Sequence, residues 1–187
     1  MKRIEVGSQK PNFIGCWDID NKNLSKEGVT PLGKNTEAKK TTDITIAPKD
    51  LEKPKFEIFK KYFNELHKCY VDYQQQWPFV KSIFGIVDVG VFNIQKYNPG
   101  AHFSHLHCER TSLNSLHRLF AFMTYLNDVE DGGKTNFDYY GIKVKPEIGK
   151  TLIWPAEWTH AHTGEVLKSG TKYIVTGWLH FPVKVIK

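Results

Sequence analysis

The half of the chain that follows residue 83 combines a two-residue hydrophobic repeat with closely spaced turn residues, and this pattern constrains the fold most. The apolar residues fall in short runs that glycine and proline interrupt. We expect strands over residues 87–97, 119–126, 142–145, 150–154 and 172–181. Many short strands joined by turns favour a β-sandwich or a β-barrel.

The preceding part of the chain predicts one amphipathic helix. Its apolar residues recur at steps of three and four, namely Phe56, Phe59, Phe63, Leu66, Tyr70 and Tyr73. Asp50 is expected to cap this helix, Pro54 to lie in its first turn and His67 to lie on its surface. Residues 12–17 and 42–46 are expected to be strands, and the basic stretch 34–40 a solvated loop.

The length and the absence of linkers indicate one domain. The 187 residues fall within the size range of a single domain. We expect residues 1–187 to fold together, with residues 1–85 supporting a functional core over residues 86–187. The predicted fold class is mainly β with packed helices (α+β).

Charge argues against a nucleic-acid reader. The net charge of +6 comes from lysine, because only Arg3, Arg110 and Arg118 are arginines. Nucleic-acid readers favour arginine for bidentate contacts and cluster their charge, whereas these lysines are dispersed. Nucleic acid is therefore not an expected partner.

Two further observations indicate a cytoplasmic protein. Neither an apolar run after the basic N-terminal residues nor a stretch of about 18 apolar residues occurs, so no membrane span is expected. Cys16, Cys69 and Cys108 are an odd number at wide spacings, which suits neither a disulfide framework nor a zinc site. We expect reduced thiols.

Histidines cluster in the strand-rich half, where seven of the eight lie beyond residue 100. On a strand, His107 and Glu109 would share one face, since residues i and i+2 point the same way. If another strand or loop supplies His162, two imidazoles and a carboxylate would occupy one face of a metal, as in non-haem Fe(II) oxygenases. The His-x-Glu pair alone is weak evidence, and His105 and His160 offer competing ligands.

Lys172 begins the last predicted strand and shares a face with residues 174, 176 and 178. A lysine among such neighbours is costly to bury without an anion. Two interpretations are open: an exposed lysine on an edge strand, or a salt bridge to the distal carboxylate of a dicarboxylate.

The candidate ligands and Lys172 belong to a longer series of motifs that follow one another along the chain. The chain supplies Tyr97, Gly100, His107, Glu109, a Tyr-Leu-Asn-Asp segment at 125–128, Gly-Gly-Lys-Thr-Asn-Phe at 132–137, His162 and Gly170-Thr171-Lys172. Over residues 90–180 it resembles the prolyl 4-hydroxylase-like branch of the 2-oxoglutarate and Fe(II)-dependent dioxygenases. The resemblance implies a distorted double-stranded β-helix, a jelly-roll or cupin-like barrel, with helices on one outer face.

The resemblance also assigns roles. It implies that His107, Glu109 and His162 bind Fe(II) and that Lys172 binds the C5 carboxylate of 2-oxoglutarate. His162 is preferred over His160 because Lys172 then falls at family spacing. The hydroxyl of Tyr97 or Tyr125 is expected to reach the same carboxylate.

Glu109 departs from the family pattern, where an aspartate is usual, and one added methylene alters the reach of the carboxylate. His105 and His160 would be neighbours of the ligands or substrate-side residues. The role of Arg118, which matches an arginine often present before the Tyr-Leu-Asn strand, is left open.

The implied reaction is the hydroxylation of an unactivated C–H bond. Dioxygen is consumed and 2-oxoglutarate is converted to succinate, with ascorbate as a supporting reductant. The first substrate expected is a prolyl residue of a peptide or protein. Alternatives are the same chemistry on a free amino acid or other small molecule, a nucleic-acid demethylase, a zinc hydrolase, and a non-catalytic jelly-roll binding module.

Overall fold

The computed structural model of the protein describes residues 25–27, 29–30, 33–34 and 37–182, with side chains from residue 37 onward. The strand expected at residues 12–17 lies outside this part. Among the described helices, none has the length and hydrophobicity to cross a membrane.

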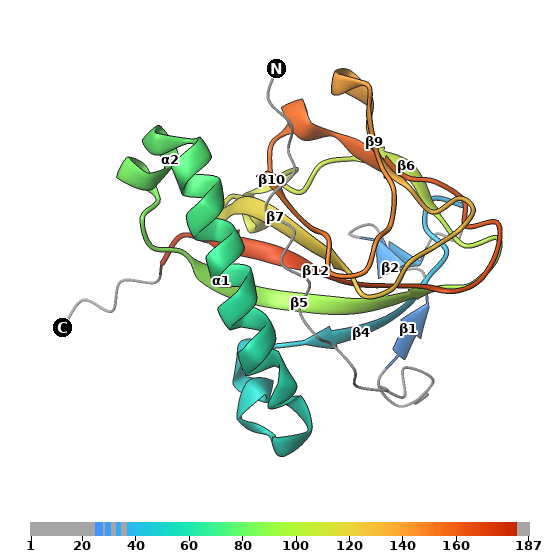
Figure 1. Cartoon of the computed structure of the whole chain (residues 1–187), viewed down its shortest axis with the longest axis horizontal. Coiled ribbons are helices and arrows are strands. Elements are labelled where there is room, and N and C mark those ends of the chain that lie inside the picture. The colour runs from blue at the N-terminus through green and yellow to red at the C-terminus, as the bar shows by residue number, and fades with distance from the viewer. Residues whose placement is uncertain (1–24, 28, 31–32, 35–36, 183–187) are drawn as a thin grey trace.

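Two antiparallel sheets form the body of the molecule (Figure 1). The major sheet has the order β1 (Ser25–Glu27), β4 (Thr42–Ile46), β5 (Asp88–Tyr97), β12 (Lys172–His180), β7 (Arg118–Tyr125) and β10 (Thr151–Pro155). The minor sheet has the order β6 (Phe103–His107), β11 (His162–Gly164), β8 (Thr135–Phe137) and β9 (Ile142–Val144). A short hairpin joins β2 (Val29–Thr30) to β3 (Gly33–Lys34). The expected class, mainly β with packed helices, is confirmed.

The helices lie on one side of the molecule and β6 and β9 on the other (Figure 1). The long helix is α1 (Ile58–Gln76), and a short helix α2 (Pro78–Ile83), which the sequence pattern did not predict, follows it. Short 3-10 turns are η1 (Pro48–Glu52), η2 (Pro54–Phe56), η3 (Leu113–Ser115), η4 (Asp138–Tyr140) and η5 (Trp158–His160). His67 is exposed on α1, as expected.

The expected start of the long helix is wrong. Asp50 lies in η1, where its carboxylate accepts a hydrogen bond from the backbone N–H of Ala47 at 3.1 Å. Lys53 is extended, with φ −77° and ψ 134°, because a residue that precedes proline disfavours the α conformation. Lys53 therefore separates η1 from η2, which begins at Pro54, and α1 begins only at Ile58.

Alternation along the central strands sorts side chains between two hydrophobic cores. On β7, Phe120 and Phe122 belong to the core that α1 covers, whereas Ala121, Met123 and Tyr125 belong to the core between the sheets. The α1 contacts are aromatic, with ring centroids 5.0 Å apart for Phe59 and Phe92. The strand has no solvent-exposed face, since residues 119–125 are all buried.

Most expected strands are confirmed, and the exceptions are short. The observed β4, β5, β7, β9, β10 and β12 match the expected ranges to within one residue at each end. The strands β6, β8 and β11, of three to five residues, were not among them. The interpretation of 34–40 as a solvated loop is wrong at Lys39, which is buried and pairs with the buried Asp43.

Candidate active site

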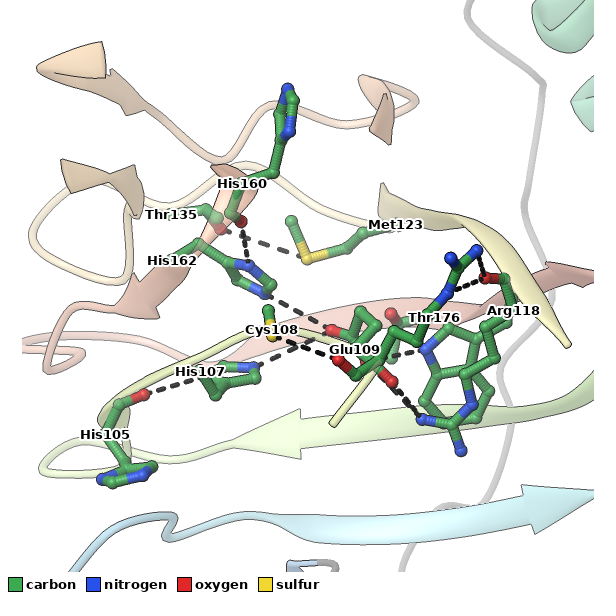
Figure 2. Close-up of polar contacts among 12 residues, drawn as sticks. His105, His107, Cys108, Glu109, Arg118, Met123, Thr135, His160, His162 and Thr176 are labelled. Carbon is green, nitrogen blue, oxygen red and sulfur yellow. Dashed lines mark hydrogen bonds and ion pairs between the residues drawn. The ribbon is translucent and has the colours of Figure 1, made fainter. Parts of the chain in front are cut away.

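Two histidines meet across the minor sheet. His107 ends β6 and His162 begins β11, and the two residues are direct partners in the antiparallel pairing. Directly opposed residues point to the same face of a sheet. The two imidazole centroids accordingly lie 4.3 Å apart (Figure 2).

Backbone carbonyls determine the tautomer of both imidazoles. His107 Nδ1 lies 2.8 Å from the carbonyl oxygen of His105, and His162 Nδ1 lies 3.0 Å from that of His160. A carbonyl oxygen only accepts, so each Nδ1 carries the proton and donates it. Each Nε2 is left with a free lone pair, which is the form a metal ligand requires.

Glu109 reaches the same point from a bend. The expectation that it shares a regular strand with His107 is wrong, because β6 ends at His107. Glu109 Oε1 nevertheless lies 3.5 Å from His162 Nε2 and 3.9 Å from His107 Nε2. The three ligand atoms lie within 4.8 Å of one another, the one such group found among the described residues. Two imidazole nitrogens and one carboxylate oxygen suit an Fe(II) site with open positions.

The second oxygen of Glu109 has its own partners, which the sequence analysis missed. Trp178 Nε1 donates to Glu109 Oε2 at 2.6 Å. The guanidinium of Arg118 lies 3.6 Å over the Trp178 ring and donates to the backbone carbonyl of Glu109 at 3.0 Å. The available signal was the alternation that puts Trp178 on the same face of its strand as Lys172.

His105 and His160 do not join the three ligand atoms. Their side chains turn away from the centre, and each contributes its backbone carbonyl instead (Figure 2). The His160 ring lies 5.0 Å from that of Tyr140, and its Nδ1 is 3.1 Å from Thr159 Oγ1.

Burial favours the neutral form of the His107 imidazole. Desolvation and the neighbouring His162 lower the pKa of His107 to about 4, although Glu109 opposes the shift. Burial and His162 also lower the pKa of His160. Phe137 and Trp154 cover His162, with ring centroids 5.5 and 5.0 Å from its imidazole.

Lys172 lies in the core between the two sheets. Only 2% of its surface is exposed, and β12 has neighbours on both sides, so the interpretation as an exposed edge lysine is wrong. Its ammonium donates to the carbonyl of Gly133 at 2.8 Å and lies 4.0 Å over the Tyr97 ring. Burial lowers the pKa of Lys172 to about 8, against the opposing effect of Glu165. Gly133 has φ +67°, which favours glycine at this close approach.

The two tyrosines near Lys172 differ in how their hydroxyls are used. Tyr97 donates to Gln95 Oε1 at 2.8 Å, and the Gln95 amide in turn donates to Asp43 at 3.2 Å. Tyr125 shares a hydrogen bond of 2.7 Å with Thr135 Oγ1, across the two sheets. Tyr97 therefore presents its ring to Lys172 while its hydroxyl is engaged elsewhere.

Comparison with known proteins gives one family model and two curated relatives. Residues 92–180 match the model of the 2OG-Fe(II) oxygenase superfamily. The chain is 27% identical to prolyl 4-hydroxylase subunit alpha-2 of Gallus gallus over 92 residues, which cover 46% of this chain and 17% of that protein. It is 29% identical to the probable prolyl 4-hydroxylase 9 of Arabidopsis thaliana over 114 residues, which cover 47% of this chain and 40% of that protein. Each match thus spans less than half of the curated relative.

A solved structure supports the expected fold. A prolyl hydroxylase from Trichoplax adhaerens, in complex with a hypoxia inducible factor oxygen degradation domain peptide fragment, superposes with a TM-score of 0.68 at 12% identity. The superposition covers 87% of this chain and 73% of that one. The expected double-stranded β-helix is confirmed. Residues 92–180 therefore resemble the 2OG-Fe(II) oxygenase superfamily, and the chain is similar to prolyl 4-hydroxylases.

Proposed function

We propose that this chain is an Fe(II)- and 2-oxoglutarate-dependent dioxygenase that hydroxylates a prolyl residue of a peptide or protein. The observation that carries the proposal is the convergence of His107, Glu109 and His162 on one point, with Lys172 buried between the sheets. We further infer that the described residues act as one domain, since β1 and β4 complete the sheet that contains β12.

The donor set fits the metal. Both Nε2 atoms are free of hydrogen, both imidazoles are fixed by carbonyls, and one carboxylate oxygen faces them. His107, Glu109 and His162 would hold Fe(II), and a single carboxylate offsets part of its charge. A zinc hydrolase is also compatible with these three ligands, but that function gives Lys172 no role.

The surroundings of Lys172 fit a carboxylate. Among residues 37–182 the ammonium forms no ion pair with an acidic side chain, and a carbonyl and an aromatic face are its partners. A buried ammonium of this kind is stabilised when an anion binds beside it. Lys172 would hold the C5 carboxylate of 2-oxoglutarate. We assign the hydroxyl contact to Tyr125, because Thr135 can be the donor in the hydrogen bond that these two hydroxyls share, whereas the Tyr97 hydroxyl donates to Gln95.

The protein's part in the reaction is to orient and to exclude water. When bound, the metal and 2-oxoglutarate supply the oxidative chemistry that inserts one oxygen atom of dioxygen into the C–H bond. His105 and His160 hold the ligand imidazoles through their carbonyls. The apolar side chains of Phe137, Trp154 and Ile174 exclude water from the space between the sheets.

Exposed aromatic residues in η4 and in η5, the turn that precedes His162, favour a peptide over a free amino acid. Trp158 in η5 and Tyr139 in η4 are 67% and 63% exposed, with ring centroids 6.5 Å apart. Aromatic surfaces of this kind bind extended proline-containing segments. The names of both curated relatives and the peptide complex of the Trichoplax protein point the same way.

Coupled turnover tests this function. The Fe(II)-loaded protein is incubated with 2-oxoglutarate, ascorbate and either a proline-rich peptide or free L-proline, and succinate and the hydroxylated product are measured. The proposal expects stoichiometric succinate and hydroxyproline with the peptide. If only free L-proline were hydroxylated, the proposed substrate would be a small molecule and not a peptide. Absence of succinate under all conditions would contradict the dioxygenase.

A further inference from the structure

We propose that Trp178 is a positioning residue for the metal ligand Glu109, and that Arg118 supports it. This inference rests on the proposed function, because it takes Glu109 as a ligand of Fe(II). It also gives a reason why a glutamate serves at a position where an aspartate is usual.

The two oxygens of Glu109 face different groups. Oε1 lies 3.5 Å from His162 Nε2, and Oε2 accepts the Trp178 indole N–H at 2.6 Å. One oxygen is thereby held away from the centre while the other is presented to it. Glu109 comes from the loop after β6, whereas Trp178 lies on β12 of the opposite sheet, so the contact links the two sheets at the candidate metal centre.

The hydrogen bond from Trp178 restrains the side chain of Glu109, which is longer and more mobile than that of an aspartate. Glutamate has one more rotatable bond than aspartate, and ordering it costs additional conformational entropy. A hydrogen bond to a carboxylate is charge-assisted and stronger than a neutral one. An aspartate at position 109 would be shorter by one methylene, so its carboxylate would lie farther from the imidazoles, from the indole or from both.

Arg118 fixes the indole in turn. Its guanidinium lies 3.6 Å over the Trp178 ring, and its Nη1 donates to the carbonyl of Glu109 at 3.0 Å. Its Nη1 also lies 4.0 Å from Oε2, so the guanidinium is an ion-pair partner of the Glu109 carboxylate. Arg110 donates two hydrogen bonds to the carbonyl of Arg118, at 2.6 and 3.0 Å, and so holds the start of β7.

The test is an anaerobic titration with Co(II), which reports both affinity and ligand geometry through its visible absorption. It compares wild type with Trp178→Phe, which removes the indole donor but keeps a ring for Arg118. Trp77→Phe is the matched control, since Trp77 is half exposed between α1 and α2. Removing a residue that hydrogen-bonds to a metal ligand lowers metal affinity by about 10–100-fold. We expect Trp178→Phe to lower Co(II) affinity by this factor and to alter the Co(II) spectrum.

A second set of Co(II) titrations uses the variant Glu109→Asp. We expect it to weaken Co(II) binding in the wild-type background, and we expect Trp178→Phe to cost little more once position 109 is aspartate. Unfolding midpoints of the metal-free variants separate loss of fold from loss of positioning. Co(II) affinity and spectrum unchanged in a folded Trp178→Phe variant would overturn the inference alone. Fully additive losses in the double variant would overturn it too. A wild type that does not bind Co(II) would overturn the proposed function itself.

Discussion

The two sheets differ both in the length of their strands and in the side chains they bring to the site. The minor sheet consists of strands of three to five residues and provides His107 and His162. The central strands β5, β7 and β12 of the major sheet have eight to ten residues and provide Tyr97, Tyr125 and Lys172. The two histidines proposed to bind the metal thus lie on one sheet, with Glu109 just after β6, and the residues proposed to bind the co-substrate lie on the other sheet.

This division implies that metal affinity and co-substrate affinity can be changed separately. A substitution in the minor sheet should act first on the metal, and a substitution in the major sheet should act first on 2-oxoglutarate. The exception is the link between Trp178 and Glu109, which joins the two sheets. The following predictions are arranged from the largest expected effect to the smallest.

Removal of a ligand imidazole should have the largest effect. We expect His107→Ala and His162→Ala each to lower Co(II) affinity by at least about 100-fold and to abolish succinate formation. The reason is that the two protein ligands that remain cannot cover one face of the ion. Isothermal titration and a succinate assay measure the two effects. A variant at either position with near-normal affinity would show that the division between the sheets is wrong.

Loss of the Lys172 charge should affect the co-substrate and leave the metal in place. A hydrogen bond to a charged group contributes about 1.5–3 kcal/mol, so Lys172→Ala should weaken 2-oxoglutarate binding by about 10–150-fold. Co(II) affinity should stay within about twofold of wild type. An equal loss of Co(II) affinity would mean that the two sheets do not act separately.

The pH dependence of 2-oxoglutarate binding should identify Lys172. Its pKa is lowered to about 8 when no anion is bound, and only the protonated ammonium pairs with a carboxylate. Affinity should therefore be level below pH 8 and fall as the pH rises above it, by up to about tenfold per unit. Lys172→Arg, which stays charged over this range, serves as the control. The same decline in Lys172→Arg would assign the titration to another group.

The two tyrosines should respond unequally. Tyr125→Phe should weaken 2-oxoglutarate binding by about 2–10-fold, the effect of one neutral hydrogen bond. Tyr97→Phe keeps the ring that lies over Lys172, and its hydroxyl bonds to Gln95, so affinity should change by less than about twofold. The reverse order of effects would assign the hydroxyl contact to Tyr97.

The smallest changes in Co(II) affinity are expected at His105 and His160, because only their backbone carbonyls contact the ligand imidazoles. His105→Ala and His160→Ala keep the carbonyls that hold the ligand imidazoles, so Co(II) affinity should stay within about threefold of wild type. If His160→Ala abolished Co(II) binding while His162→Ala did not, the distal ligand would be His160.

The sequence alone allowed prediction of the long elements and of the candidate site residues. Strands such as β5 and β12 are long enough for their alternation to be visible, and α1 shows a clear period of three and four. The strands β8 and β11, each of three residues, are too short to show any period. Their positions depend on pairing with other strands, since β11 pairs with β6 and β8, and β8 pairs with β11 and β9.

The partners of the site residues were harder to predict than the residues themselves. His107, Glu109, His162 and Lys172 are separated by motif spacings that the chain displays directly. The contact between Trp178 and Glu109 joins residues 69 positions apart, and the pairing of Lys39 with Asp43 buries a lysine from a basic stretch. Such contacts follow from how the two sheets face each other, which local patterns do not encode.

The most direct test of the central claim is an anaerobic titration of the Fe(II)-loaded protein with 2-oxoglutarate, followed by visible absorption. If the minor sheet holds the metal and Lys172 holds the co-substrate beside it, a charge-transfer band should appear and saturate. The band should require a higher 2-oxoglutarate concentration in Lys172→Ala and be absent in His162→Ala. A wild type that binds Fe(II) and shows no band, or an unchanged titration in Lys172→Ala, would contradict the account.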